Sequence, residues 1–172
     1  LEQLYIKRGF KFFDAPTERR LRDTDGLGSA TKTALVHHGA EGLEVVEVEV
    51  DGHLGTVQVG GTLDASAPTG GHGGFVETSA AHVKVADGAR VTTLASAGTT
   101  GTWLIDPLDF IIGSDPGDNI SGSALSLALV DNDVIITNAP GVGNGDIFVE
   151  DAVTWGTATT LSLRASRNAN IN

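Results

Sequence analysis

Cysteine is absent from the 172-residue chain. Its absence excludes disulfide bonds, cysteine-ligated zinc, iron–sulfur clusters and a thiol nucleophile. It also suits a chain that crosses an oxidising periplasm unfolded, where cysteines would pair prematurely. Aromatic residues are scarce as well, at 5% of the sequence. A core built from this chain must therefore consist mainly of Val, Ile, Leu and Ala.

Basic residues and long apolar runs are few. The chain has 11 Lys and Arg against 22 Asp and Glu, a formal net charge of −11. Such a surface repels phosphate backbones, which argues against nucleic-acid binding. No apolar run reaches the about 18 residues of a membrane-spanning helix, so we expect no membrane insertion. The chain begins LEQLYIKRG, without Met, and we interpret it as an excised or processed fragment.

Glycine, by contrast, is abundant at 23 residues. From Gly52 onward, short apolar runs recur, and each is closed by Gly, Asn, Asp or Pro, which favours short strands joined by tight turns. The runs that we predict as strands are 56–60, 74–79, 82–88, 90–95, 102–106, 109–113, 124–129, 133–138, 146–151 and 160–165. The turns between them look too short to contain helices.

Short strands with tight turns favour a solenoid over a β-sandwich, although a Greek-key sandwich remains an alternative. We therefore predict an all-β fold, a right-handed parallel β-helix (β-solenoid). Coils of about 20 residues would stack through strand hydrogen bonds at a spacing of about 4.8 Å. At that length, the repeat region would form about six coils.

The first 50 residues differ from the rest of the chain. They hold most of the basic residues, and residues 1–14 have an apolar pattern that indicates a strand or hairpin. Residues 46–50 alternate Val with Glu, which predicts a strand with one solvated face. We therefore divide the chain into an N-terminal cap or appendage (1–50) and a β-helix repeat domain (51–172).

Three ordered motifs carry a family resemblance: GTLDAS (61–66), GGFVETS (73–79) and WLIDPLD (103–109). Residues 145–172 add a short strand, a Trp-containing coil and L-x-L-x-A followed by Asn-rich turns. This combination resembles the repeat region of filamentous-haemagglutinin-like adhesins, exoproteins exported by two-partner secretion, and it covers about residues 54–172. The positions that match the family motif, to which we assign structural roles, are Gly73, Gly74, Glu77, Thr78, Ser79, Trp103, Leu104, Asp106, Pro107 and Asp109.

The resemblance implies a module of a secreted protein of the bacterial cell surface. The parent protein would pass through an outer-membrane transporter and would contact a glycan or protein on a host or bacterial surface. It implies no catalytic residue, no cofactor and no metal site. Residues 1–50 fit no repeat of that family.

Several residues allow a second interpretation. Trp103 and Trp155 fill the coil interior or pack at a corner, or they stack against sugar rings. Asp106 and Asp109 flank Pro107, which indicates turn chemistry, although calcium binding or an acid–base pair are alternatives. Asn119 begins an N-x-[ST] sequon, a candidate for glycosylation.

Other patterns carry little chemistry. His37 and His38 are adjacent and would point to opposite faces of a strand, which makes a poor metal pair. GVGNGD (141–146) lacks the Lys-Ser/Thr of a phosphate loop and is followed by an apolar run, so we predict a turn.

Three functions compete. The first is a non-catalytic adhesin module or stalk that acts by extended surface contact. The second is a self-assembling subunit of an extracellular fibre, joined through residues 1–14 or through open coil ends. The third is a carbohydrate-active β-helix enzyme, and it is disfavoured because no base of the repeat region lies near an acidic cluster in the sequence. Those bases are Lys84, Arg90, Arg164 and Arg167.

Overall fold

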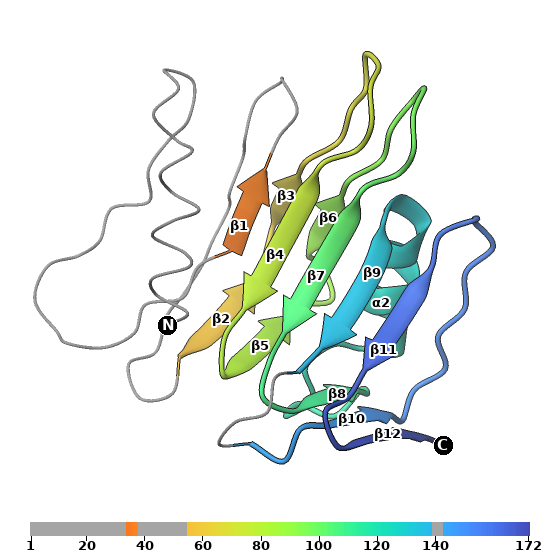
Figure 1. Ribbon diagram of the computed structural model, residues 1–172. Helices are drawn as coiled ribbons and strands as arrows, with labels where there is room; N and C mark the ends of the chain where they lie inside the picture. The colour runs from red at the N-terminus through yellow and green to blue at the C-terminus, as the bar shows by residue number, and fades with distance from the viewer. Residues whose placement is uncertain (1–33, 38–54, 139–142) are drawn as a thin grey trace, which may run out of the picture.

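The computed structural model describes residues 34–37, 55–138 and 143–172 (Figure 1). These residues form short strands and one helix, α2. The strands are β1 (Ala34–His37), β2 (Thr56–Val59), β3 (Thr62–Asp64), β4 (Phe75–Ser79), β5 (His82–Val85), β6 (Arg90–Thr92), β7 (Thr102–Asp106), β8 (Phe110–Ile112), β9 (Asp133–Thr137), β10 (Asp146–Val149), β11 (Leu161–Arg164) and β12 (Asn168–Ile171).

The strands stack as a parallel β-solenoid of about four turns. One wall is the sheet β4–β7–β9–β11, in which each strand pairs parallel with the next (Figure 1). Strand β1 adds antiparallel to the free edge of β4. The predicted fold class is therefore confirmed. Of the predicted cap (1–50), the structure describes β1, and the strands expected at 1–14 and 46–50 lie outside the described residues.

The other walls follow the same coil order. Strands β2 and β5 pair in parallel, as do β3 and β6, and β8, β10 and β12 form a third parallel sheet. Helix α2 follows β8 and packs beside β6, in the place where a further strand of that wall would lie (Figure 1). The chain therefore visits each wall in turn before it reaches the next coil.

The coils are longer and fewer than predicted. Phe75 of β4 pairs with Thr102 of β7, and Asp133 of β9 accepts a hydrogen bond from Thr160, 27 residues later. The prediction of about six coils of about 20 residues is therefore wrong. The extra length lies between the strands, for example in the loop from β3 to β4 and in helix α2.

The predicted strand at 124–129 is also wrong, because this run lies in helix α2 (Gly122–Asp131). The Ser121 side chain accepts a hydrogen bond from the Ala124 amide and caps the N-terminus. Ala and Leu are strong helix formers, and Ala124, Leu125 and Leu129 lie on the buried face. The alternation of Leu with small residues in ALSLAL imitates a half-buried strand, which explains the error.

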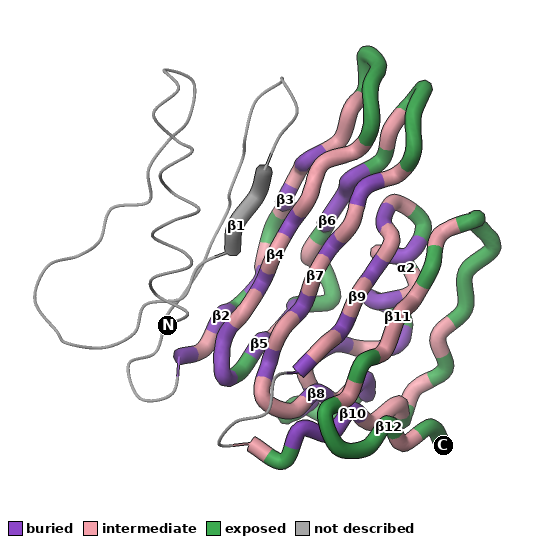
Figure 2. The backbone as a smooth tube through the Cα atoms, in the orientation of Figure 1, coloured by how far each residue is buried: buried purple, intermediate pink, exposed green. Residues whose placement is uncertain are grey.

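Inward side chains form continuous columns through the solenoid. In the first wall, Val76, Trp103 and Val134 are in register and fully buried, and Leu161 in the last described coil is half-buried. Figure 2 shows this change, with buried residues along the inner coils and exposed residues along the last one. The outward side chains alternate with these columns, so each strand has one core face and one outer face.

Glycines allow two coils to approach each other at one corner. The amide of Gly73 donates to the carbonyl of Thr99, and the amide of Gly101 donates to that of Thr93. A Cβ atom on Gly73 would lie 1.7 Å from the Thr93 oxygen and 2.5 Å from the Gly101 nitrogen. Both of these atoms belong to the backbone and are hydrogen-bonded to each other, so they cannot move apart without breaking that bond.

The close packing at this corner leads us to expect different effects on stability for two glycine substitutions. Gly73→Ala should lower the free energy of unfolding by about 1–3 kcal/mol or more, as overpacking does in well-packed interiors. Gly60→Ala is the matched control, because a Cβ atom there would meet nothing within 4 Å. Urea denaturation followed by circular dichroism would measure both variants. Equal stability of the two would contradict the close packing at this corner.

Candidate functional site

The motif residues of β4 hold the coil stack together. Glu77 and Ser79 lie on the outer face, where the Ser79 hydroxyl donates to the Glu77 carboxylate at 2.8 Å. Thr78 points inward and is fully buried. Its hydroxyl accepts a hydrogen bond of 3.1 Å from the indole nitrogen of Trp103 in the next coil. Together with the Gly73–Gly74 corner, these contacts support a structural role for the motif.

The WLIDPLD motif also contributes to the stack. Trp103 is fully buried, which favours the core interpretation over sugar stacking for this residue. Leu104 lies on the outer face of β7, opposite Glu77. Asp106 is half-buried and pairs with Ser79 in register, and its carbonyl accepts a hydrogen bond from the Ala80 amide. Pro107 follows as a buried turn residue.

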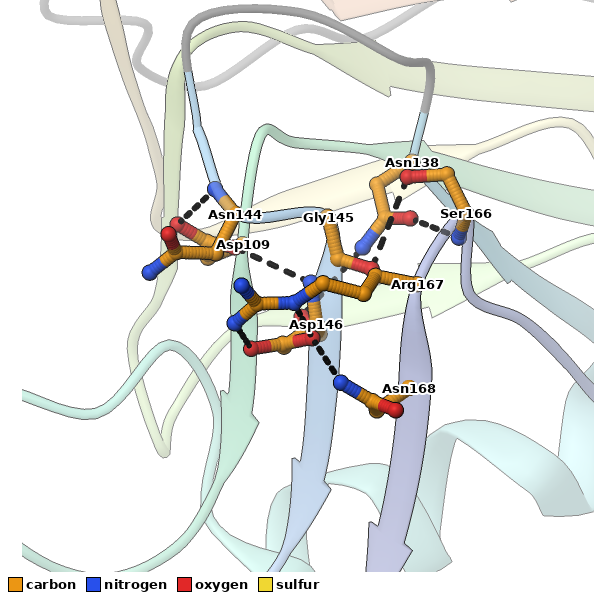
Figure 3. Close-up of polar contacts among 8 residues, drawn as sticks. All are labelled: Asp109, Asn138, Asn144, Gly145, Asp146, Ser166, Arg167 and Asn168. Carbon is orange, nitrogen blue, oxygen red and sulfur yellow. Dashed lines mark hydrogen bonds and ion pairs between the residues drawn. The ribbon is translucent and has the colours of Figure 1, made fainter.

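Asp109 belongs to a polar cluster at the corner between β9 and β10 (Figure 3). Its carboxylate accepts hydrogen bonds from the Asn144 amide at 3.2 Å and from the Asp146 amide at 3.0 Å. It therefore binds the backbone of the next coil, a contact 35 and 37 residues along the chain that differs from the local turn hydrogen bonds expected around Pro107. Asp106 is not a member of the cluster drawn in Figure 3, which consists of Asp109, Asn138, Asn144, Gly145, Asp146, Ser166, Arg167 and Asn168.

Asp146 is the centre of this polar cluster. Its buried carboxylate forms an ion pair with the Arg167 guanidinium and accepts a 3.0 Å hydrogen bond from the Asn168 side chain. The side chain of Asn138 joins the same corner, because it donates to the Asp146 carbonyl and accepts from the Ser166 amide. The cluster thus binds three consecutive coils to one another.

Electrostatics favour the charged form of this pair. The hydrogen bonds from the Arg167 guanidinium hold the pKa of the Asp146 carboxyl below its usual range, although burial acts in the opposite direction. Asp146 in turn raises the pKa of Arg167. The carboxylate is therefore ionised, and its oxygens are occupied by Arg167 and Asn168. This arrangement stabilises the corner.

Asn119, the candidate for glycosylation, joins two sheets. Its side-chain nitrogen donates to the Val83 carbonyl of β5 at 2.6 Å, and its side-chain oxygen accepts from the Ile111 amide of β8 at 2.7 Å. Its backbone carbonyl also accepts from the Val85 amide. The segment around Asn119 thus fills the space between β5 and β8 as an extra rung. Glycosylation would attach the sugar to the same nitrogen that donates to the Val83 carbonyl.

Two ion pairs were not visible in the sequence. Arg90 pairs with Asp131 at 3.0 Å, and Arg167 pairs with Asp146. The partners are 41 and 21 residues apart, so no local motif could have identified them. The coil repeat is the signal that was missing, because it brings residues of consecutive coils together although they are far apart in the sequence.

Trp155 is the second tryptophan and lies on the surface. The residue is 38% exposed, and its indole nitrogen donates to the Thr159 carbonyl at 3.0 Å. The sequence left open whether this residue is buried or binds sugar. Because it is exposed in the loop between β10 and β11, Trp155 does not fill the coil interior.

The described part of the chain contains neither a cluster of metal ligands nor a membrane-spanning helix. Among those residues, no group of three or more His, Asp or Glu side chains has a geometry that would hold a metal ion. His72 interacts with Thr99 of the neighbouring loop, and His38 lies outside the described residues. No described helix combines the length and the apolar character needed to span a membrane.

Comparison of the chain with protein-family models, with curated proteins and with solved structures gives no match. The residue contacts above are therefore the basis for a functional proposal, together with the motif resemblance.

The Asp146–Arg167 pair predicts a pH dependence of stability. Because the folded-state pKa of Asp146 is lowered, its stabilising contribution is present above the unfolded pKa of about 3.9 and is lost as pH falls through the folded value. Wild-type protein should therefore lose more stability than Asp146→Asn on acidification below about pH 4. Urea titrations between about pH 2 and pH 7 would measure this difference.

Arg90→Gln is the control for that experiment, because it removes an ion pair whose arginine is 66% exposed. Exposed pairs contribute little to stability, so this variant should follow the wild-type pH profile. Parallel profiles for the wild type and Asp146→Asn would show that the buried pair does not contribute.

Proposed function

We propose that the chain is a non-catalytic repeat module or stalk of a secreted bacterial cell-surface adhesin, acting by extended surface contact. One observation carries the proposal. The motif residues that resemble filamentous-haemagglutinin-like proteins bind one coil to the next, as in Thr78 with Trp103 and Asp109 with Asp146. Residues that specify a stack are what a rod requires, and a rod offers its outer faces over a length set by the number of coils.

The acidic and basic groups support the same proposal over a carbohydrate-active enzyme. Solenoid enzymes need several carboxylates, or a base and carboxylates, grouped on an exposed face. Here the Asp109 carboxylate accepts hydrogen bonds from backbone amides, and the Asp146 carboxylate is paired with Arg167. Lys84, another candidate base, donates to the backbone carbonyls of Pro116 and Asp118.

Adhesion would be measured with fluorescent beads that carry the chain. We expect saturable retention under flow on an epithelial monolayer or a bacterial lawn, with inhibition by free chain. Beads coated with an unrelated protein of equal negative charge are the control, because the net charge of −11 alone affects attachment. Retention no greater than this control, or insensitive to free chain, would contradict an adhesive role and leave that of a spacer.

A second function, self-assembly into a fibre, is favoured by the last described coil. One interior column runs through Ile112, Val149 and Ile171, in register across β8, β10 and β12. Ile112 is fully buried, Val149 is half-buried and Ile171 is 72% exposed. An exposed apolar column beside a free strand edge can accept a further coil, including one from a second copy.

Assembly predicts that the solution mass rises with concentration and that filaments appear in electron micrographs. Ile171→Asp should prevent this growth, because a charge would replace the apolar contact at the coil end. Leu127→Asp is matched in exposure, at 69%, but lies on the flank of α2, and it should assemble normally. A constant monomer mass in light scattering, or equal effects of the two substitutions, would contradict assembly through this end.

A further inference from the structure

The loop that carries Trp155 is held firmly against the solenoid. The Thr154 amide donates to the Ser126 hydroxyl at 2.9 Å, and the Thr160 amide donates to the Asp133 carboxylate at 2.8 Å. Between them, the hydroxyls of Thr157 and Thr159 both donate to the carbonyl of Leu129. We call residues 154–160 the Trp155 loop. Its anchoring means that the aromatic ring is presented in one position, so binding would cost little ordering entropy.

Trp155 is partly exposed, and the indole nitrogen is the single polar atom of its side chain. That nitrogen already donates to the Thr159 carbonyl within the same loop. The residue is 38% exposed, and a ligand that contacts the ring would meet carbon rather than a free donor. Burial as part of the core does not explain this residue, since an indole that filled the core would be enclosed as Trp103 is.

Helix α2 extends the apolar surface beside the loop. Leu127 and Val130 are 69% and 45% exposed and lie three positions apart, on one face of the helix. Ser126 and Leu129, their neighbours in sequence, are the residues that bind the Trp155 loop. The loop therefore runs along the edge of this exposed helix face.

The electrostatic surroundings select against an anionic ligand. The loop itself has no charged residue. Asp133 binds its C-terminal end, and Asp151, just before the loop, binds the Gly122 amide through its carboxylate. With a net charge of −11, the chain as a whole also repels polyanions. A ligand that suits this site combines an apolar face with neutral hydroxyl groups.

We propose that the Trp155 loop is a binding platform for a neutral glycan. The C–H face of a pyranose ring would stack on the indole, and its hydroxyls would donate hydrogen bonds to the threonine hydroxyls of the loop. The protons of Thr157 and Thr159 are used within the structure, on the Leu129 carbonyl and in the 2.8 Å contact between the two hydroxyls, so their remaining lone pairs are the acceptors. This inference rests on the proposed adhesin function and names the class of ligand that one face of the module binds.

The binding test uses the full chain with defined oligosaccharides. The neutral probes are lactose, maltohexaose, cellohexaose, chitohexaose and mannohexaose, and the anionic comparators are sialyllactose and heparin. Because Trp103 is fully buried, quenching of tryptophan fluorescence by iodide reports on Trp155. We expect at least one neutral probe to protect Trp155 from quenching, and the anionic probes to bind more weakly. No protection by any neutral probe, or stronger binding of heparin, would overturn the proposal.

Variants distinguish stacking on Trp155 from other contacts. Saturation-transfer NMR would compare wild-type chain with Trp155→Ala, for which we expect a loss of affinity of about tenfold or more. Trp155→Phe keeps an aromatic face without the indole donor and should retain part of the affinity. Leu94→Ala is the control, since Leu94 is 44% exposed, follows β6 and lies outside the loop. Equal affinity of wild type and Trp155→Ala would overturn the proposal.

Two measurements keep the result interpretable. Circular dichroism melting of each variant would show whether a loss of binding reflects a loss of fold. Bead retention on cells, measured with the wild-type chain and with Trp155→Ala, separates the glycan platform from the adhesin function. Retention that persists while no neutral glycan binds overturns the glycan platform alone, whereas absence of retention for wild-type beads contradicts the adhesin function itself.

Discussion

The structure depends on one constraint, the parallel register between consecutive coils. Each inner strand of the wall β4–β7–β9–β11, that is β7 and β9, must satisfy its backbone hydrogen bonds with the strand one coil earlier and one coil later. A coil can gain residues between strands, but each strand must return to the same position. This explains why the coil can contain a loop at one level and helix α2 at the next while Val76, Trp103 and Val134 remain in line.

Wherever the strand ladder is interrupted, buried side chains replace the missing backbone contacts. Helix α2 interrupts the wall of β3 and β6, and Asn132 at its end donates to the carbonyls of Val91 and Ala128. Its side-chain oxygen accepts from the Thr93 hydroxyl, so a fully buried amide is satisfied on both sides. Asn119 does the same between β5 and β8, and the Asp109 carboxylate does so for the backbone amides of Asn144 and Asp146 at the start of β10. These residues are polar because backbone groups in the interior must be paired.

The sequence allowed the strands to be predicted well and the contacts between coils poorly. Runs such as TWLID alternate cleanly, so their strands and inward faces follow from the period of two. The run ALSLAL alternates in the same way, yet the Ser121 cap and its Ala and Leu content favour a helix. Coil length was underestimated because only strands and turns were counted. The Asp146–Arg167 pair and the role of Asn119 depend on neighbours 21 and 36 residues away, which no local pattern reveals.

The same constraint separates residues that build the solenoid from residues that are available for binding. Thr78, Trp103 and Asp109 cannot change without disturbing a neighbouring coil, and for that reason the motif describes architecture. Side chains on the outer faces and in loops such as 154–160 meet no such requirement, because the register is already fixed by the strands beneath them. Recognition in a solenoid therefore belongs to positions outside the repeat motif. Trp155 fits this rule, since it is a large apolar side chain placed on a rigid loop where the stack does not need one.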